Sequence, residues 1–269
     1  KCSIPLQYCF FAEKKTIGIL SLRRKPMIIF GRFVLGLVIT GLGGLLWTAQ
    51  ASSTPALVLA ERELGSDYLI VTPDEALPAE RTAAIELKTY LGRVTGAEFA
   101  IAKETEIASP ASQYPLQLFV GPTKAFAEAF PEVDLSSLGH DGIVIKTKDD
   151  RLFLAGGRPR GTLYAVYTFL EEVAGVRWWG SRPDEETVPS IPALEIPPLD
   201  LVYVPTLQYR EAFYRGAFDG VYAARSKCNG HFERIPVEYG GHYNLIGWCH
   251  TFYPFLPPEK YFADHPEWY

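Results

Sequence analysis

The sequence predicts an α/β protein in which a mixed-sheet accessory domain precedes the truncated start of a (β/α)8 barrel-like domain. Two observations support this fold class. Strand-like and helix-like patterns alternate along residues 68–179, and a hairpin signal within that region requires a mixed sheet. A proline-rich stretch, 189–205, then separates this region from a second strand and helix.

The elements of the first region follow from the spacing of its apolar residues. Such residues recur at helical spacing from Ala83 to Val94, and Gly96 then ends the pattern. Asp149 and Asp150 lie between two apolar runs, which indicates a hairpin. We predict strands at 68–73, 98–104, 116–122 and 176–179, a hairpin within 142–157, and helices after Pro78, within 123–130 and within 157–175.

The proline-rich stretch divides the rest of the chain into domains. We expect the accessory domain at 58–197, a linker at 198–206, and the start of the barrel-like domain at 207–269. The accessory domain has an ordinary domain size and is expected to fold alone. The last region predicts one strand, 207–214, and one helix, 218–230. Because a (β/α)8 barrel needs about 250 residues, we expect the chain to be a fragment.

Residues 1–51 are typical of an upstream region followed by a signal peptide. A basic flank that includes Arg23 and Arg24 precedes an apolar run of 15 residues, 33–47, and small residues precede Ser52 as they do at a cleavage site. A membrane-spanning helix needs about 20 apolar residues, so we favour a cleaved leader over an uncleaved membrane anchor. The protein is then exported, to the periplasm, the cell surface or the medium.

Charge and cysteine content restrict the partners. Residues 52–269 contain 19 basic and 30 acidic residues, a formal net charge of −11. Such a surface repels phosphate backbones, so we expect no nucleic-acid partner. Cys228 and Cys249 either form a disulfide or remain two buried thiols. The spacing of the histidines and of Cys249 fits no standard zinc pattern, and we predict neither a metal nor a cofactor.

Several sequence blocks resemble known families. The block GGRPRGTLYAVYTFLEEVAGVRWW, at 156–179, resembles the accessory domain that precedes the barrel in alpha-glucuronidases of glycoside hydrolase family 67 and in family 20 beta-hexosaminidases. The later blocks YREAFY, AARSKCNGHF and CHTFYPFLPPEKYFADHPEWY resemble the domain of unknown function 4838, which commonly follows such a domain in exported bacterial proteins. The resemblance covers about residues 58–269 and implies a role in carbohydrate processing, without fixing a substrate.

The composition of residues 201–269 is typical of a polar-ligand pocket. This region holds 17 of the 36 aromatic residues and four of the five histidines. Flat rings stack on a sugar, and arginine or histidine side chains hydrogen-bond its hydroxyls. The Gly-Gly pair before Arg158 and Arg160 lacks the spacing of a nucleotide-binding loop and predicts a tight turn into a helix.

Arg210 and Glu211 are the first candidate substrate-binding residues. They lie at the predicted carboxyl end of the first barrel strand, the face where barrel enzymes bind ligands. The resemblance to family 20 enzymes implies that an arginine on this strand binds sugar hydroxyls, and Arg210 matches that position. The alternative is a structural ion pair, for which Glu211 is a candidate partner.

Four further residues complete the predicted site. Arg225 and Asn229 end the predicted helix and brace the pocket, or they form a solvated helix end with its cap. Trp248 stacks on a sugar and His250 donates a hydrogen bond to it, or both fill the core of a loop.

The leading functional hypothesis is a glycoside hydrolase, similar to alpha-glucuronidases or hexosaminidases, that acts in polysaccharide degradation with a carbohydrate as its partner. The alternative is a non-catalytic carbohydrate-binding or cell-surface protein on the same scaffold. A glycosidase needs two carboxylates about 5 to 10 Å apart. No convincing pair precedes Tyr269, so the catalytic residues are unknown, and we expect this fragment to be inactive.

Overall fold

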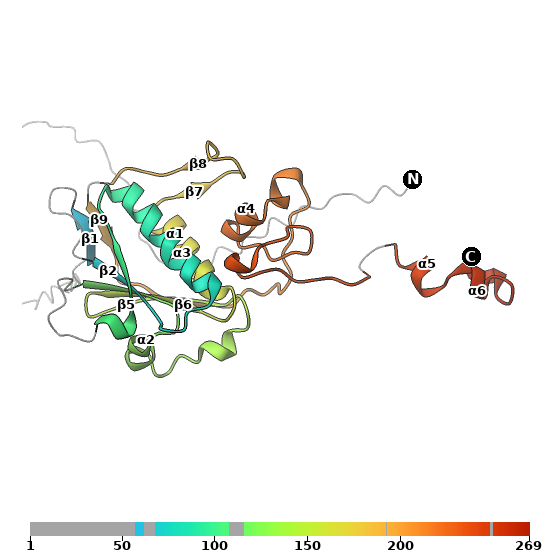
Figure 1. Cartoon of the computed structure of the whole chain (residues 1–269), viewed down its shortest axis with the longest axis horizontal. Coiled ribbons are helices and arrows are strands. Elements are labelled where there is room, and N and C mark those ends of the chain that lie inside the picture. The colour runs from blue at the N-terminus through green and yellow to red at the C-terminus, as the bar shows by residue number, and fades with distance from the viewer. Residues whose placement is uncertain (1–56, 62–67, 108–115, 192, 248–249) are drawn as a thin grey trace, which may run out of the picture. The chain divides into compact units, whose positions relative to one another are not determined.

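A six-stranded mixed sheet is the framework of the computed structural model (Figure 1). The structure describes residues 57–61, 68–107, 116–191, 193–247 and 250–269, and the predicted leader lies outside them. Parallel pairing joins β2, β3, β4 and β6, while β5 and β10 are antiparallel to their neighbours. The strand order is β10 (Asp200–Tyr203), β5 (Ile143–Lys148), β6 (Arg151–Gly156), β4 (Leu116–Val120), β2 (Tyr68–Thr72) and β3 (Ala100–Lys103). The predicted mixed α/β class is therefore confirmed.

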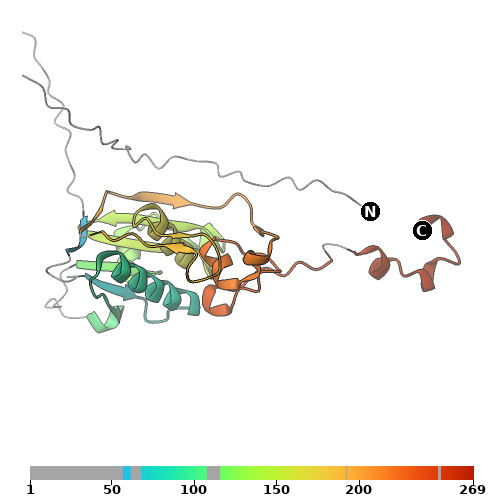
Figure 2. The ribbon, with the colours of Figure 1, turned by 90° about the horizontal axis from the view of Figure 1, so that it is seen from above.

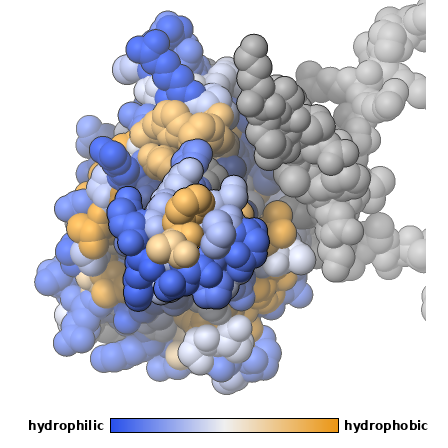
Figure 3. Space-filling view, turned by 90° about the vertical axis from the view of Figure 1, so that its right-hand side faces the viewer, coloured by the Kyte–Doolittle hydropathy of each residue, from blue (hydrophilic) through white to orange (hydrophobic). Residues whose placement is uncertain are grey.

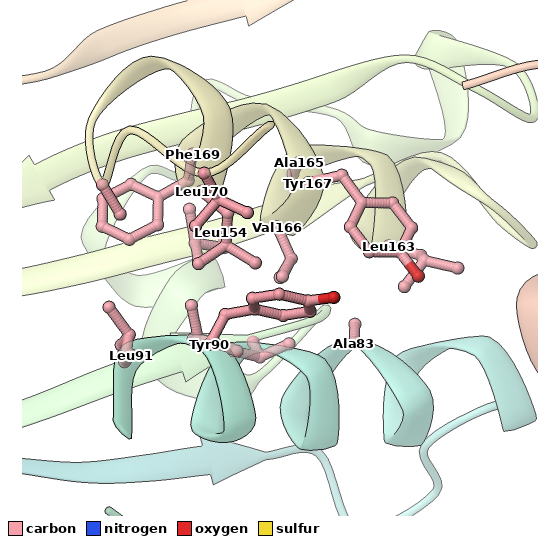
Figure 4. Packing of buried hydrophobic residues seen from close by; sticks show 14 of the residues in the cluster. Ala83, Tyr90, Leu91, Leu154, Leu163, Ala165, Val166, Tyr167, Phe169 and Leu170 are labelled. Carbon is pink, nitrogen blue, oxygen red and sulfur yellow. The ribbon is translucent and has the colours of Figure 1, made fainter. Parts of the chain in front are cut away.

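Helices cover both faces of this sheet. α1 (Pro78–Thr95) and α3 (Gly161–Glu172) pack beside each other on one face, and α2 (Lys124–Ala129) lies on the other (Figures 1 and 2). Two buried apolar clusters fill the two layers. In the larger one, the side chain of Tyr90 reaches from α1 toward α3, where Val166 lies above it (Figure 4).

Local signals explain where α1 begins and ends. Pro78 occupies the first turn, where its missing N–H costs nothing. The Glu80 carboxylate accepts a hydrogen bond from the backbone N–H of Leu77 at 2.7 Å, which satisfies a donor outside the helical pattern. Gly96 ends the helix in the left-handed conformation, with φ of 78°. The helix predicted after Pro78 is confirmed with these limits.

The predicted hairpin is also confirmed. β5 and β6 pair up to Lys148 opposite Arg151, and the turn between them consists of two residues. Asp149 and Asp150 have φ values of 49° and 57°, as the two central positions of a type I′ turn require. Aspartate tolerates this left-handed region better than most residues do.

The remaining strands form two small antiparallel pairs, and the remaining helices are short. The strand pairs are β1 (Leu57–Glu61) with β9 (Ala193–Ile196) and β7 (Arg177–Trp178) with β8 (Glu186–Thr187). The short α-helices are α4 (Gly220–Arg225), α5 (Phe252–Phe255) and α6 (Pro258–Tyr261). The 3-10 helices are η1 (Glu104–Ile107), η2 (Leu135–Leu138), η3 (Arg215–Phe218), η4 (Val237–Tyr239) and η5 (Pro266–Trp268). No helix within the described ranges combines the length and apolar character that crossing a bilayer requires.

The segment predicted as a linker, 198–206, contains a strand. β10 pairs with β5, with Val202 opposite Val144. Its residues lie between Pro198 and Pro205 and include no proline, so their N–H groups can pair with the otherwise open edge of β5. The proline-rich stretch therefore adds an edge strand to the sheet.

The predicted strand at 207–214 is wrong. The backbone of Arg210 bonds Asn229 instead of a strand: its N–H donates to the Asn229 Oδ1 at 2.8 Å, and its C=O accepts from the Asn229 N–H at 2.9 Å. The predicted helix 218–230 is shorter than expected, because Lys227 turns the chain at φ of 58° after α4. The barrel-like domain stays a prediction.

We predict that Leu87→Ala destabilises the chain by about 2–5 kcal/mol, because Leu87 is fully buried on the inner side of α1 and its truncation leaves a cavity. Ile85→Ala in the same helix is the matched control, since Ile85 is 56% exposed and should change stability by no more than about 0.5 kcal/mol. Urea unfolding followed by circular dichroism measures both values. Equal losses for the two variants would contradict this packing.

Candidate functional site

A buried carboxylate, that of Asp141, is the centre of the candidate site. Asp141 is 6% exposed and lies between η2 and β5. Its Oδ1 accepts from the Arg160 Nε at 2.5 Å, and its Oδ2 accepts from the Arg210 Nη2 at 3.1 Å and the Asn229 Nδ2 at 2.6 Å. One carboxylate therefore joins the start of α3, the segment after β10 and the segment after α4.

Glycines bring Arg160 beside Asp141. A Cβ atom on Gly157 would lie 1.7 Å from the Gly139 carbonyl oxygen, and one on Gly161 would lie 2.2 Å from that of Gly142. Only glycine allows the loop before β5 to approach the start of α3 so closely. The N–H groups of Arg160 and Gly161 donate to the His140 carbonyl at 3.1 and 3.0 Å. This structure agrees with the tight turn predicted for the motif, and these two amides already have a partner.

Arg210 is held by three acceptors. Its Nε donates to the Lys227 carbonyl at 2.9 Å, its Nη1 to the Leu207 carbonyl at 2.8 Å, and its Nη2 to Asp141. The guanidinium also lies over the Tyr164 ring, 5.9 Å from its centroid. Arg210 therefore pairs with Asp141 and not with Glu211, the partner that the sequence suggested.

Asn229 is fully buried and forms hydrogen bonds with both members of the ion pair, Arg210 and Asp141. Its Nδ2 donates to Asp141 and to the Gln208 carbonyl, at 2.6 and 2.8 Å, and its Oδ1 accepts from the Arg210 N–H. Both amide N–H donors are thus used inside the protein. Asn229 thus holds the backbone of Arg210 and the carboxylate of Asp141 together.

A pocket of about 460 Å³ lies against this network. This volume falls within the range of small-molecule sites. The Tyr243 hydroxyl lies 3.0 Å from the His140 Nδ1, and the Arg160 guanidinium lies 4.8 Å from the centre of the Tyr243 ring. The polar and aromatic lining includes Ser137, His140, Asp141, Gln208, Arg210 and Tyr243. The sequence singled out Arg210 alone among these residues as a ligand contact.

Glu211 belongs to a separate polar cluster. Its Oε2 accepts from the Tyr209 hydroxyl, while its Oε1 is buried and has no hydrogen-bond partner among the described residues. Glu233 is fully buried and accepts from the Ala212 and Gly230 N–H groups at 3.1 and 2.9 Å. Burial raises the pKa of Glu233, and the charge of Glu211 raises it further. Both carboxylates accept their hydrogen bonds from residues 209–230, and Glu211 does not line the pocket.

Arg225 attaches α4 to the helical layer. Its Nη2 lies 3.1 Å from the Glu86 Oε2 of α1, and the Tyr167 hydroxyl of α3 donates to the same oxygen at 3.2 Å. The guanidinium lies 5.4 Å from the centre of the Tyr90 ring, and burial raises the pKa of Tyr90 to about 12. Arg225 is thus bound within the protein and does not line the pocket.

The other predicted residues lie near the C-terminus. Trp248 and Cys249 fall outside the described residues, so the stacking role of Trp248 and the disulfide stay predictions. His250 is exposed, at φ of 53°. Cys228 has no disulfide partner in the described part of the chain, and burial raises its pKa to about 12. The described residues include no group of three potential metal ligands.

The stretch from residue 202 to residue 218 exposes several apolar side chains. Figure 3 shows hydrophobic residues set among hydrophilic ones on the side seen in that view. Along residues 202–218 the exposed fractions reach 61% for Leu207 and 65% for Phe213. The exposed apolar residues of this stretch are Val202, Tyr203, Val204, Leu207, Phe213, Tyr214 and Phe218.

Comparison with solved structures finds similar chains among glycoside hydrolases. A family GH115 4-O-methyl-alpha-glucuronidase, BtGH115A, with specificity for decorated arabinogalactans, is 16% identical over 66% of this chain and 28% of its own, with a TM-score of 0.45. A mutant beta-hexosaminidase from Streptomyces plicatus is 15% identical over 65% of this chain and 32% of its own, with a TM-score of 0.38. The chain therefore spans less than a third of the length of either structure. No curated protein sequence matches it.

Two family models match the sequence itself. Residues 58–169 match the glycosyl hydrolase family 67 N-terminus, and residues 179–269 match the domain of unknown function DUF4838. Both are the families that the sequence blocks resemble. The chain therefore combines a region of the glycosyl hydrolase family 67 N-terminal type with a region of the DUF4838 type.

Proposed function

We propose that the chain is the N-terminal part of an exported glycoside hydrolase that degrades polysaccharide, with an activity similar to that of alpha-glucuronidases or hexosaminidases. The observation that carries this proposal is the match of residues 58–169 to the glycosyl hydrolase family 67 N-terminus. The pocket beside Asp141 gives the proposal a place to test, because it combines a cavity with polar and aromatic groups.

The chemistry of the pocket suits a saccharide. Arg210 has five N–H donors, of which three are used within the protein, so two are free for ligand hydroxyls or a carboxylate. Its side chain is 20% exposed. Tyr243, His140 and Gln208 line the same pocket, and the His140 and Gln208 side chains are exposed. In this proposal Arg210 is a saccharide contact.

Catalysis is assigned to the rest of the protein. Glu211 and Glu233 are enclosed by their own segment, so neither is free to flank a glycosidic bond. The apolar side chains exposed along residues 202–218 support a larger assembly, because such a surface is usually covered in the complete protein. The catalytic carboxylates would then lie in the part that covers it.

The activity test uses the full-length protein that contains this chain. We expect it to hydrolyse 4-nitrophenyl glycosides of glucuronic acid or of N-acetylglucosamine. Arg210→Ala should weaken binding of the active glycoside at least about tenfold, since it removes hydrogen bonds from a charged donor. Arg182→Ala is the control, because Arg182 is 67% exposed in a surface ion pair and its loss should leave affinity within about twofold.

The second candidate is a non-catalytic carbohydrate-binding protein. One observation favours it: the described site offers hydrogen-bond donors for a glycan but no free pair of carboxylates that could cleave a glycosidic bond. Calorimetric binding of a glycan with no turnover of any tested glycoside would support this candidate and exclude the hydrolase. Absence of both binding and turnover would exclude both.

We further propose that the protein is exported through the leader within residues 1–51. Expression of the whole chain in a bacterial host should give a mature form that begins at Ser52, because small residues precede it at the spacing of a cleavage site. Mass spectrometry of the secreted or periplasmic fraction determines this N-terminus. A product that keeps residues 33–47 and stays in the membrane fraction would show an anchor instead.

A further inference from the structure

We propose that Asp141 is the positioning residue for Arg210: its charge fixes the guanidinium at the wall of the pocket, in the orientation that leaves two N–H donors free. The part of this inference that concerns a ligand rests on the proposed function. The part that concerns Arg210 itself does not, and the experiment below separates the two.

Asp141 is the only carboxylate within ion-pair distance of Arg210 in the described part of the chain. The other acceptors of Arg210 are the neutral carbonyls of Leu207 and Lys227. All three contacts have the ionised guanidinium as donor, and Asp141 alone adds the attraction of an opposite charge. Asp141 therefore contributes the strongest of the three contacts and decides where the Nη2 end of the guanidinium lies.

The Asp141 carboxylate is itself held in place. Its side chain is 7% exposed, and donors from Arg160 and Asn229 occupy it in addition to Arg210. The backbone on both sides of it is fixed by the close approach of Gly139 and Gly142 to the start of α3. An anchor that cannot rotate holds its partner in one orientation, so Arg210 reaches the pocket already ordered.

The charges around the pocket favour this role. Arg160 is 4% exposed and also pairs with Asp141, so the single negative charge of Asp141 is shared between two arginines. The positive charge of Arg210 is then only partly offset, and its side chain keeps access to the pocket at 20% exposure. The arrangement orders Arg210 without neutralising it.

A second ion pair in the same protein supplies the control. Glu86 and Arg225 are 3.1 Å apart, with side chains 12% and 23% exposed, compared with 7% and 20% for Asp141 and Arg210. The two pairs have the same N–O distance and similar burial, and neither Glu86 nor Arg225 lines the pocket. Glu86→Gln therefore removes a comparable charge at a remote position.

The test measures hydrogen exchange of arginine side chains by NMR on the whole chain labelled with 15N-arginine, with the signal of the Arg210 Nη2–H group, which donates to Asp141, assigned through Arg210→Lys. Asp141→Asn should make that signal exchange about tenfold faster, as loss of a charge-assisted contact requires. Glu86→Gln should leave it unchanged and instead accelerate Arg225. If Asp141→Asn does not fold, Asp141→Asn combined with Arg160→Gln removes the buried charges together and is measured in its place.

Ligand binding supplies the second readout. The affinity of the 4-nitrophenyl glycoside that the unaltered protein binds should fall about tenfold in the Asp141 variant, and it should be unchanged by Glu86→Gln. Unchanged Arg210 exchange would overturn the proposal, and so would faster exchange with full affinity. If the unaltered protein binds neither glycoside, the proposed function fails, while the exchange result still decides whether Asp141 orders Arg210.

Discussion

The rest of the site depends on the hydrogen bonds and ion pairs that the buried Asp141 carboxylate forms. It receives donors from Arg160, Arg210 and Asn229, which belong to three separate segments. Removing one partner of a buried ion pair leaves an uncompensated charge and costs about 3–5 kcal/mol. The loop before β5, the start of α3 and the two segments around α4 therefore have to pack together.

This constraint changes how the domain organisation is understood. The chain after β10 packs on the α/β layer through Asp141 and through the pairing of Arg225 with Glu86. Tyr164 of α3 also donates from its hydroxyl to the Cys228 carbonyl at 2.6 Å. The pocket draws its wall from both sides, with His140 from the accessory region and Gln208 from the following segment. The predicted boundary thus runs through the candidate site.

Much of the α/β layer could be predicted because its signals are local. Helical spacing up to Gly96, apolar runs closed by Gly-Pro, and Asp149-Asp150 each act within a few residues. The contacts of Asp141 could not be predicted, because its partners Arg210 and Asn229 lie 69 and 88 positions away in the sequence. The strand prediction for 207–214 was wrong for a related reason. The apolar pattern is local, but the backbone of Arg210 forms its hydrogen bonds with Asn229, which is distant in the sequence. Arg210 was placed in the site for its chemistry, while its partner was unknown.

The measurement that tests this account most directly compares the thermal unfolding of residues 52–206 with that of residues 52–269. The shorter chain keeps all six strands of the sheet but loses Arg210, Asn229 and Arg225, so Asp141 and Glu86 lose partners that bury them. We expect it to lack a cooperative transition or to melt well below the longer chain. A cooperative transition at the same temperature would show that the α/β layer is independent of these contacts, and would contradict the account.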